Sequence, residues 1–223
     1  NPPLFYKGEG ESASEFRSEP DAKKHVLAHV FKVVMDPFVG KLGIFRVHQG
    51  TITKDTQLFV GDGRKPFKVG HLFMLQGGKN VEIERAVPGD IAAVAKVDEI
   101  GFDCVLHDSH DEDHIHMRPL EFPTPMQGVA ITPKKRGDEQ RISEVLHRMI
   151  AEDPTLVVEH DATTNETVLR ALGDLHLRSV LERMASQFKL EVDTRPPRIP
   201  YRETITAQAE GFHRHKKQTG GAG

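Results

Sequence analysis

Cysteine, tryptophan and long apolar runs are scarce or absent in this chain of 223 residues. The single cysteine, Cys104, cannot form a disulfide within the chain, which fits a reducing, cytoplasmic compartment. No apolar run approaches the roughly 20 residues of a membrane-spanning helix, and the N-terminus lacks a signal-peptide pattern. The net charge of −3 provides no global field toward nucleic acid, so any such binding has to come from local patches. We therefore expect a cytoplasmic protein without membrane contacts.

The chain also lacks a phosphate-binding loop. Such a loop needs Gly-x-x-x-x-Gly-Lys-Ser/Thr, because its amides cradle phosphates and its hydroxyl binds magnesium. The nearest candidate, Gly40-Lys41, is followed by Leu42, which cannot coordinate the metal. No Ser-His-Asp pattern or metalloprotease motif occurs, and no motif pairs Cys104 with a histidine, so we read that thiol as a small buried hydrophobe. We expect that this chain binds no GTP or magnesium and catalyses no reaction by itself.

The N-terminal half predicts a β-barrel that follows a linker. Residues 1–24 are polar and rich in Ser, Glu, Gly and Pro, which predicts little fixed structure, and the missing initial methionine indicates a piece of a longer protein. Over residues 25–118, short β-type runs alternate with turns, and Asp62-Gly63 between two runs is a strong hairpin signal. The expected strands are 28–34, 43–47, 57–60, 67–69 and 91–95. Their spacing of about 8–12 residues predicts a closed or nearly closed small barrel.

A different pattern covers residues 119–196. Apolar residues spaced i, i+3, i+4 and i+7 predict a helix over 138–153, with Asp138 as N-cap and Pro154 as its stop. A second helix is expected over 174–188, and strands over 128–132, 156–159, 167–172 and 190–193. The order β-α-β-β-α-β is the split βαβ, ferredoxin-like α+β fold, with both helices on one face of the sheet. Residues 197–223 are expected to begin the first strand of a further, truncated domain.

Six motifs follow one another along the chain: Asp36-Pro-Phe-Val-Gly-Lys-Leu-Gly-Ile-Phe-Arg-Val-His-Gln-Gly50, Pro88-Gly-Asp-Ile91, Phe122-Pro-Thr-Pro-Met126, the run from Glu152 to His176, Tyr201-Arg-Glu-Thr-Ile205 and His215-Lys-Lys-Gln-Thr-Gly-Gly221. In this order they resemble elongation factor G, the GTP-driven ribosomal translocase. The order matches the second and third domains of that family and the start of the fourth, with residues 1–24 as the tail of a preceding GTPase domain. The family usually has Gly-Met-Gly-Glu-Leu-His where this chain has Ala171-Leu-Gly-Asp-Leu-His176, and Arg where it has Ala222. These departures leave a paralogue open.

The resemblance implies a translation factor that couples GTP hydrolysis to tRNA–mRNA translocation. Its partners would be the ribosome (ribosomal RNA, small-subunit proteins and tRNA–mRNA) and its own GTPase domain, which would precede residue 1 and hold GTP and Mg. We expect a monomer. Two alternatives stay open: a ribosome recycling or protection factor of the same family, and a GTPase-free module that binds the ribosome or another RNA without turnover.

Two residues are candidates for an inter-domain relay. The resemblance places Thr155 and His176 near the junction of the GTPase switch with the second and third domains. The alternative for His176 is that it only caps a helix start and packs beneath the sheet.

Two groups of residues are candidates for ribosome contact. The resemblance implies that Lys41, Arg46 and His48 in the barrel contact phosphates of small-subunit ribosomal RNA. It places Lys216, Lys217 and Gln218 in a loop at the tip that enters the decoding region, where cations and an amide suit phosphate. The alternatives are a solvated strand face and a flexible basic tail.

A histidine-rich segment is the remaining candidate. His107, His110, His114 and His116, with neighbouring carboxylates, could supply zinc or nickel ligands. However, the segment lies in an inter-domain connection according to the resemblance, and acidic, His-rich linkers are commonly just solvated. We therefore expect no metal site and keep this set as an alternative.

Overall fold

The computed structural model describes residues 3–36 and 38–214. Its strands are β1 (Leu4–Lys7), β2 (Ser14–Arg17), β3 (Leu27–Asp36), β4 (Gly40–Gln49), β5 (Ile52–Thr53), β6 (Gln57–Val60), β7 (Phe67–Lys68), β8 (Leu72–Gln76), β9 (Lys79–Glu82), β10 (Arg85–Ala86), β11 (Ile91–Ala95), β12 (Val105–His107), β13 (Ile115–His116), β14 (Gln127–Pro133), β15 (Val157–Asp161), β16 (Glu166–Ala171) and β17 (Val192–Arg195). The α-helices are α1 (Glu139–Glu152) and α2 (Asp174–Phe188), and the 3₁₀ turns are η1 (Gly10–Ser12) and η2 (His110–Glu112). None of the helices in this described part is long and apolar enough to cross a membrane.

The predicted barrel is confirmed as a curled eight-stranded sheet. Its strand order is β7-β6-β12-β3-β4-β11-β8-β9, and β3 and β4 form its longest hairpin. Register shifts within this hairpin are β-bulges, which increase strand twist and help a sheet to curl. The curled sheet encloses one apolar core, which includes Val30, Phe45 and Leu58. The hairpin predicted at Asp62-Gly63 joins β6 to β7, with Leu58 opposite Phe67.

The prediction that residues 1–24 have little fixed structure was wrong. β1 pairs with β2 and also with β13, which forms a three-stranded sheet beside the barrel. Phe5 is fully buried there, in a small cluster with Leu27, Val105 and Ile115. Phe16 of the same segment packs against this cluster as well. The polar composition of the segment hid these apolar anchors, whose partners lie up to about a hundred residues away in sequence.

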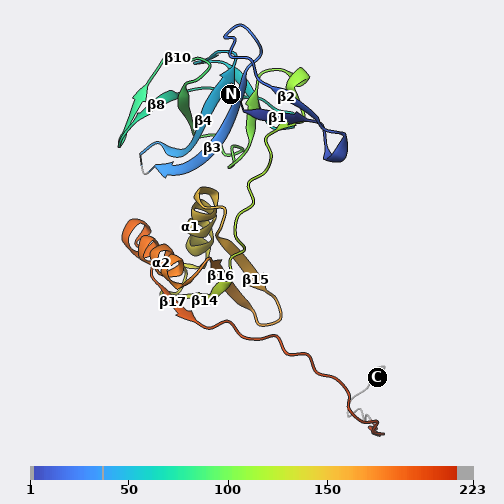
Figure 1. Ribbon diagram of the computed structural model, residues 1–223. Coiled ribbons are helices and arrows are strands. Elements are labelled where there is room, and N and C mark those ends of the chain that lie inside the picture. Colours follow the sequence, from blue (N-terminus) through green and yellow to red (C-terminus); the bar gives the residue numbers. More distant parts are fainter. Residues whose placement is uncertain (1–2, 37, 215–223) are drawn as a thin grey trace, which may run out of the picture.

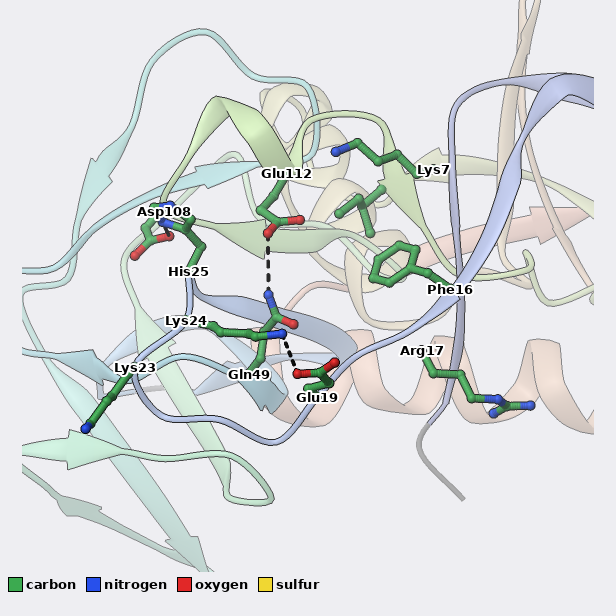
Figure 2. A pocket seen from close by; sticks show the side chains of 11 residues that line it. Lys7, Phe16, Arg17, Glu19, Lys23, Lys24, His25, Gln49, Asp108 and Glu112 are labelled. Carbon is green, nitrogen blue, oxygen red and sulfur yellow. Dashed lines mark hydrogen bonds and ion pairs between the residues drawn. The ribbon is translucent and has the colours of Figure 1, made fainter.

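A cavity of about 660 Å³ lies where this N-terminal segment meets the barrel. Figure 2 shows Gln49 donating to Glu112 and Lys24 paired with Glu19, while Lys23 points away from these groups. His25 also lines the cavity, and its Nδ1 lies 3.2 Å from a carboxylate oxygen of Asp108. Two of these contacts, Gln49 to Glu112 and His25 to Asp108, join segments that lie far apart in the sequence.

The split βαβ fold predicted for residues 119–196, called the third domain below, is confirmed. The sheet order is β15-β16-β14-β17, all antiparallel neighbours, and both helices lie on the same side of it (Figure 1). The helix faces predicted from spacing are the buried ones, with Ile142, Val145, Leu146 and Met149 from α1 and Leu177, Val180 and Met184 from α2. Asp138 occupies the N-cap position of α1 but makes no side-chain capping hydrogen bond.

The strand expected at the start of a further domain is not present in the described residues. Residues 196–214 contain no strand or helix, and Tyr201 and Ile205 are more than four-fifths exposed. An isolated strand cannot satisfy its backbone groups without a neighbouring strand. Figure 1 shows this segment leading away from β17 as an extended chain.

Gly50 offers a test of how the barrel holds the N-terminal segment. Its φ is +75°, and a Cβ there would lie 2.6 Å from the Val26 backbone. We expect Gly50→Ala to lower the free energy of unfolding by about 3 kcal/mol, from backbone strain plus overpacking. Gly77→Ala, with φ +59° and open space around it, should cost about 1 kcal/mol. Urea denaturation would measure both, and equal losses would contradict the packing argument.

Candidate functional site

The most informative local feature is the end of α1, where Glu152 and Asp153 stand side by side before Pro154. A helix C-terminus carries a partial negative charge, so acids there are unfavourable by about 0.3–1 kcal/mol each unless cations or donors compensate. Pro154 disfavours helical geometry at Asp153, which is extended with φ −128° and ψ 100°. The two carboxylates are therefore directed to different partners.

Glu152 joins the third domain to the barrel. One carboxylate oxygen accepts from the backbone N–H of Met35 in β3, and the other is paired with the guanidinium of Arg183 in α2. The Glu152 side chain is only 9% exposed, which strengthens both interactions. The preceding residue, Ala151, packs against the barrel core. Figure 1 shows the same arrangement, with the end of α1 facing the barrel beneath β3.

Asp153 brings together the two residues predicted as an inter-domain relay. Its Oδ1 accepts from the Thr155 hydroxyl at 2.6 Å and from the Thr155 N–H at 2.9 Å. Its Oδ2 lies 3.0 Å from Nε2 of His176 in the first turn of α2. The Leu172 N–H points at Nδ1 of the same ring at 3.4 Å, which assigns the proton to Nε2 and makes that nitrogen the donor to Asp153. Thr155, His176 and the ends of α1 and β16 thus meet at one carboxylate.

The environment of Asp153 favours its charged form. Partial burial alone would raise the pKa of this carboxyl, but the two hydrogen bonds from Thr155 and the nearby His176 ring outweigh it and lower the pKa. Asp153 is therefore a carboxylate at neutral pH and a constant acceptor for Thr155 and His176.

A cavity of about 900 Å³ lies beside the Glu152 contact, between the barrel and the third domain. Its charged lining consists of Lys41, Lys96, Arg148 and Arg183 with Asp36, Asp98 and Glu152. The mixture of signs fits an interface between two domains of one chain, which is usually more polar than an obligate interface.

Three apolar side chains are exposed close to His176. Gln127 pairs with Ala171, so Met126 and Leu172 extend from the same end of the β14–β16 pair, and Leu175 begins α2. They are 79%, 42% and 78% exposed, respectively. Neighbouring exposed apolar side chains of this size are typical of a surface that another domain covers.

The barrel residues predicted to contact RNA do not form one cluster. Lys41 lies at the end of β4 near the third domain, and its ammonium donates to the Asp98 carbonyl at 2.7 Å. Arg46 and His48 lie roughly 16 Å or more further along the strand, beside Pro88 and Gly89. Arg46 is exposed, whereas His48 is half-buried and its ring contacts Phe5 edge-on.

His48 is a poor candidate for a cationic contact. Burial, together with the nearby His29 and Arg46, lowers the pKa of this imidazole to about 4. The ring is therefore neutral at pH 7 and adds no charge to a phosphate contact.

The four candidate metal ligands do not converge on one point, although His107 and His110 both lie within 4 Å of an oxygen of Asp113, at 3.6 and 3.1 Å. His107 is 1% exposed and bonds the carbonyl oxygens of Gly61 and Ser109. His110 pairs with Asp113, His114 with Asp62, and His116 stacks on Tyr6. Within the residues that the structure describes, no three His, Cys, Asp or Glu side chains gather around a possible ion.

The remaining predictions concern Cys104 and the C-terminal loop. Cys104 packs against the barrel core, and burial raises the pKa of its thiol, which disfavours the reactive thiolate. It precedes β12 and is not within a strand. Lys216, Lys217 and Gln218 lie outside the described residues.

Comparison with known proteins decides the family. A family model for elongation factor G domain 2 matches residues 25–101, and one for elongation factor G domain III matches residues 122–196. The chain belongs to the elongation factor G family. The first matched range covers the barrel except for β12, and the second covers the split βαβ domain, so the recognition made from motif order is confirmed.

The relatives of this chain extend well beyond it. Elongation factor G of Ruegeria pomeroyi is 34% identical over 220 residues, which is 98% of this chain and 31% of the relative. Elongation factor G of Cereibacter sphaeroides is 35% identical over 219 residues. A crystal structure from Thermus thermophilus has a TM-score of 0.68 and 32% identity, and covers 81% of this chain and 27% of that one. The chain thus spans about a third of the length of its curated relatives.

Sequence reasoning missed the carboxylates that organise the joint. Glu152 and Asp153 were read only as part of a family motif, although two acids at a helix C-terminus are themselves a signal that cationic partners exist. Met35 could not be found from sequence, because its contribution is a backbone N–H at the end of a strand.

Removing the Glu152 carboxylate tests the joint. In Glu152→Ala the Met35 N–H loses a charged acceptor, a loss of about 1.5–3 kcal/mol, so we expect its hydrogen exchange to become about 10–100 times faster. The exchange of core amides such as Val94 should change little. Glu144→Ala, on the exposed side of the same helix, is the matched control. Unchanged exchange at Met35 would show that Glu152 does not hold the two domains together.

The low pKa of His48 leads us to expect that the folded protein loses stability in acid. Because its folded pKa of about 4 lies below its ordinary value near 6.5, the unfolded chain binds more protons between these values. Stability should fall as pH drops from 6.5 to 4. With allowance for solvent access, His48→Gln should reduce this fall by about 1–2 kcal/mol. Thermal or urea unfolding at pH 7 and 4.5 measures the difference, with the exposed His147→Gln as control, and parallel curves would refute it.

Proposed function

We propose that this chain is the transmission part of a translation factor that binds the ribosome and couples GTP hydrolysis to tRNA–mRNA translocation in the cytoplasm. The GTP and magnesium would be held by a GTPase domain outside these residues, and the factor would act as a monomer. Family membership supports this, since curated relatives over almost the whole chain carry the name elongation factor G.

One observation carries the proposal: two consecutive carboxylates connect both sides of a joint. Glu152 reaches β3 of the barrel and Arg183 of α2, while Asp153 reaches His176 at the start of α2. The Asp153–His176 contact therefore opposes a displacement of the N-terminal end of α2. The Glu152–Arg183 ion pair opposes a displacement of α2 along its own axis. Since Glu152 ends α1 and Asp153 is the next residue, the third domain would transmit such a displacement to the barrel.

The input to this relay would arrive at the apolar side chains beside His176. Met126, Leu172 and Leu175 form an exposed surface that suits the factor's own GTPase domain as partner. The Thr155–Asp153–His176 contacts lie immediately behind that surface and would fix its geometry.

The output would reach the ribosome through the barrel and the tip of the next domain. Arg46 is exposed and accessible to ribosomal RNA phosphate, and Lys41 lies at the joint, where domain movement would alter its access. Lys216, Lys217 and Gln218 stay our candidates for contact near the decoding site. His48 orients this surface through Phe5 and is neutral.

The relay can be tested in the intact protein with its upstream sequence. His176→Gln should lower ribosome-stimulated GTP turnover and translocation by about 10-fold or more, the equivalent of one charge-assisted hydrogen bond, and leave ribosome-free GTP hydrolysis unchanged. Asp153→Asn should have the same effect, and the double variant should be no worse than either single one. His147→Gln on α1 is the control.

Three results would redirect the proposal. Full translocation by His176→Gln would refute the relay. Ribosome splitting or drug protection without translocation would favour the recycling or protection alternative. An upstream sequence without a phosphate-binding loop would favour the GTPase-free binding module.

A further inference from the structure

Glu166 is a buried carboxylate in the third domain that the proposed relay does not use. It begins β16, so it lies at the opposite end of that strand from Leu172 and His176. Its side chain is only 2% exposed. Burial of a carboxylate is costly unless it is paired, so its partners reveal what this position holds in place.

Both partners lie where the chain leaves the domain. The Arg195 guanidinium, at the end of β17, is 2.7 Å from Oε1, and Nε of Arg198 is 3.5 Å from the same oxygen. The Arg198 backbone N–H donates to Oε2 at 2.8 Å. Among the described residues no donor meets Oε1 with hydrogen-bond geometry, so Coulombic attraction to the two guanidinium groups holds it. Because that attraction depends on the Glu166 charge, a neutral isostere should release the arginines.

The chain beyond Arg198 makes little contact with the domain. Every described residue from Arg198 to Arg214 is exposed. Pro196, Pro197 and Pro200 fix φ on both sides of Arg198, and a proline-rich segment is extended and semi-rigid. A direction imposed at Arg195 and Arg198 is therefore carried outward by the segment itself.

We propose that Glu166 is a positioning residue that sets the direction in which the chain leaves the third domain, and so the placement of the domain that follows. The carboxylate holds the two arginines, and the prolines convert this anchor into an oriented spacer. This inference goes beyond the proposed function and requires neither nucleotide nor ribosome, so it can fail or succeed independently.

The test compares Glu166→Gln with the unsubstituted sequence of this chain in solution. Spin labels at Ser186→Cys on α2 and Thr204→Cys on the exit segment, in a Cys104→Ala background, report the direction of the segment by dipolar distance measurement. We expect a narrow distance distribution for the parent and one at least about twice as wide for Glu166→Gln. The Arg198 amide should exchange at least about tenfold faster, since its charged acceptor is lost.

Two further variants keep the result decisive. Glu159→Gln removes the carboxylate that pairs with Arg170 on the same sheet but does not touch the exit segment, and it should leave the distribution narrow. If Glu166→Gln fails to fold, Arg198→Gln decides, because that side chain is 62% exposed and its replacement leaves the core packing unaltered. A distribution that stays narrow in the folded variant, or one that is already broad in the parent, would overturn the proposal.

Discussion

The last turn of α1 places two negative side chains at the negative end of a helix, and the arrangement of both domains depends on how those charges are compensated. Burial and the helix dipole both oppose the charge of these carboxylates, and their partners offset that cost. Glu152 meets a strand N–H of the barrel and an arginine of α2, while Asp153 meets Thr155 and His176. Pro154 disfavours helical geometry at Asp153, so the Asp153 side chain points in a different direction from that of Glu152, the last residue of the helix. One electrostatic constraint thus fixes both the internal geometry of the third domain and its seat on the barrel.

The rest of the joint is comparatively loose. It consists of a cavity with charges of both signs and an extended connection between β13 and β14. A large apolar interface would lock the domains, whereas a few charged contacts beside a cavity permit rearrangement at smaller cost.

Sequence reasoning recovered what depends on local pattern. The helix spacing of Ile142 and Met149, the stop at Pro154 and the hairpin at Asp62-Gly63 are encoded within a few residues, and the structure has them all. The relay pair Thr155 and His176 came from family resemblance, and their meeting point, Asp153, emerged only in three dimensions. Features built from distant contacts were missed. Phe5 depends on partners up to Ile115, and the pKa of His48 depends on burial that composition does not reveal.

The pairing of β1 with β13 has a mechanical consequence. β1 lies in the chain that enters the barrel, and β13 immediately precedes the connection that leaves it for the third domain. Tension applied to the chain at β1 is therefore transmitted to the chain at β13 through the hydrogen bonds between these two strands, without deformation of the barrel core. If that ladder peeled apart, Ile115 and His116 would join the tether and lengthen it by roughly 7 Å. The β1–β13 pairing thus connects the two ends of the barrel chain directly, and its loss would lengthen the connection by the span of two residues.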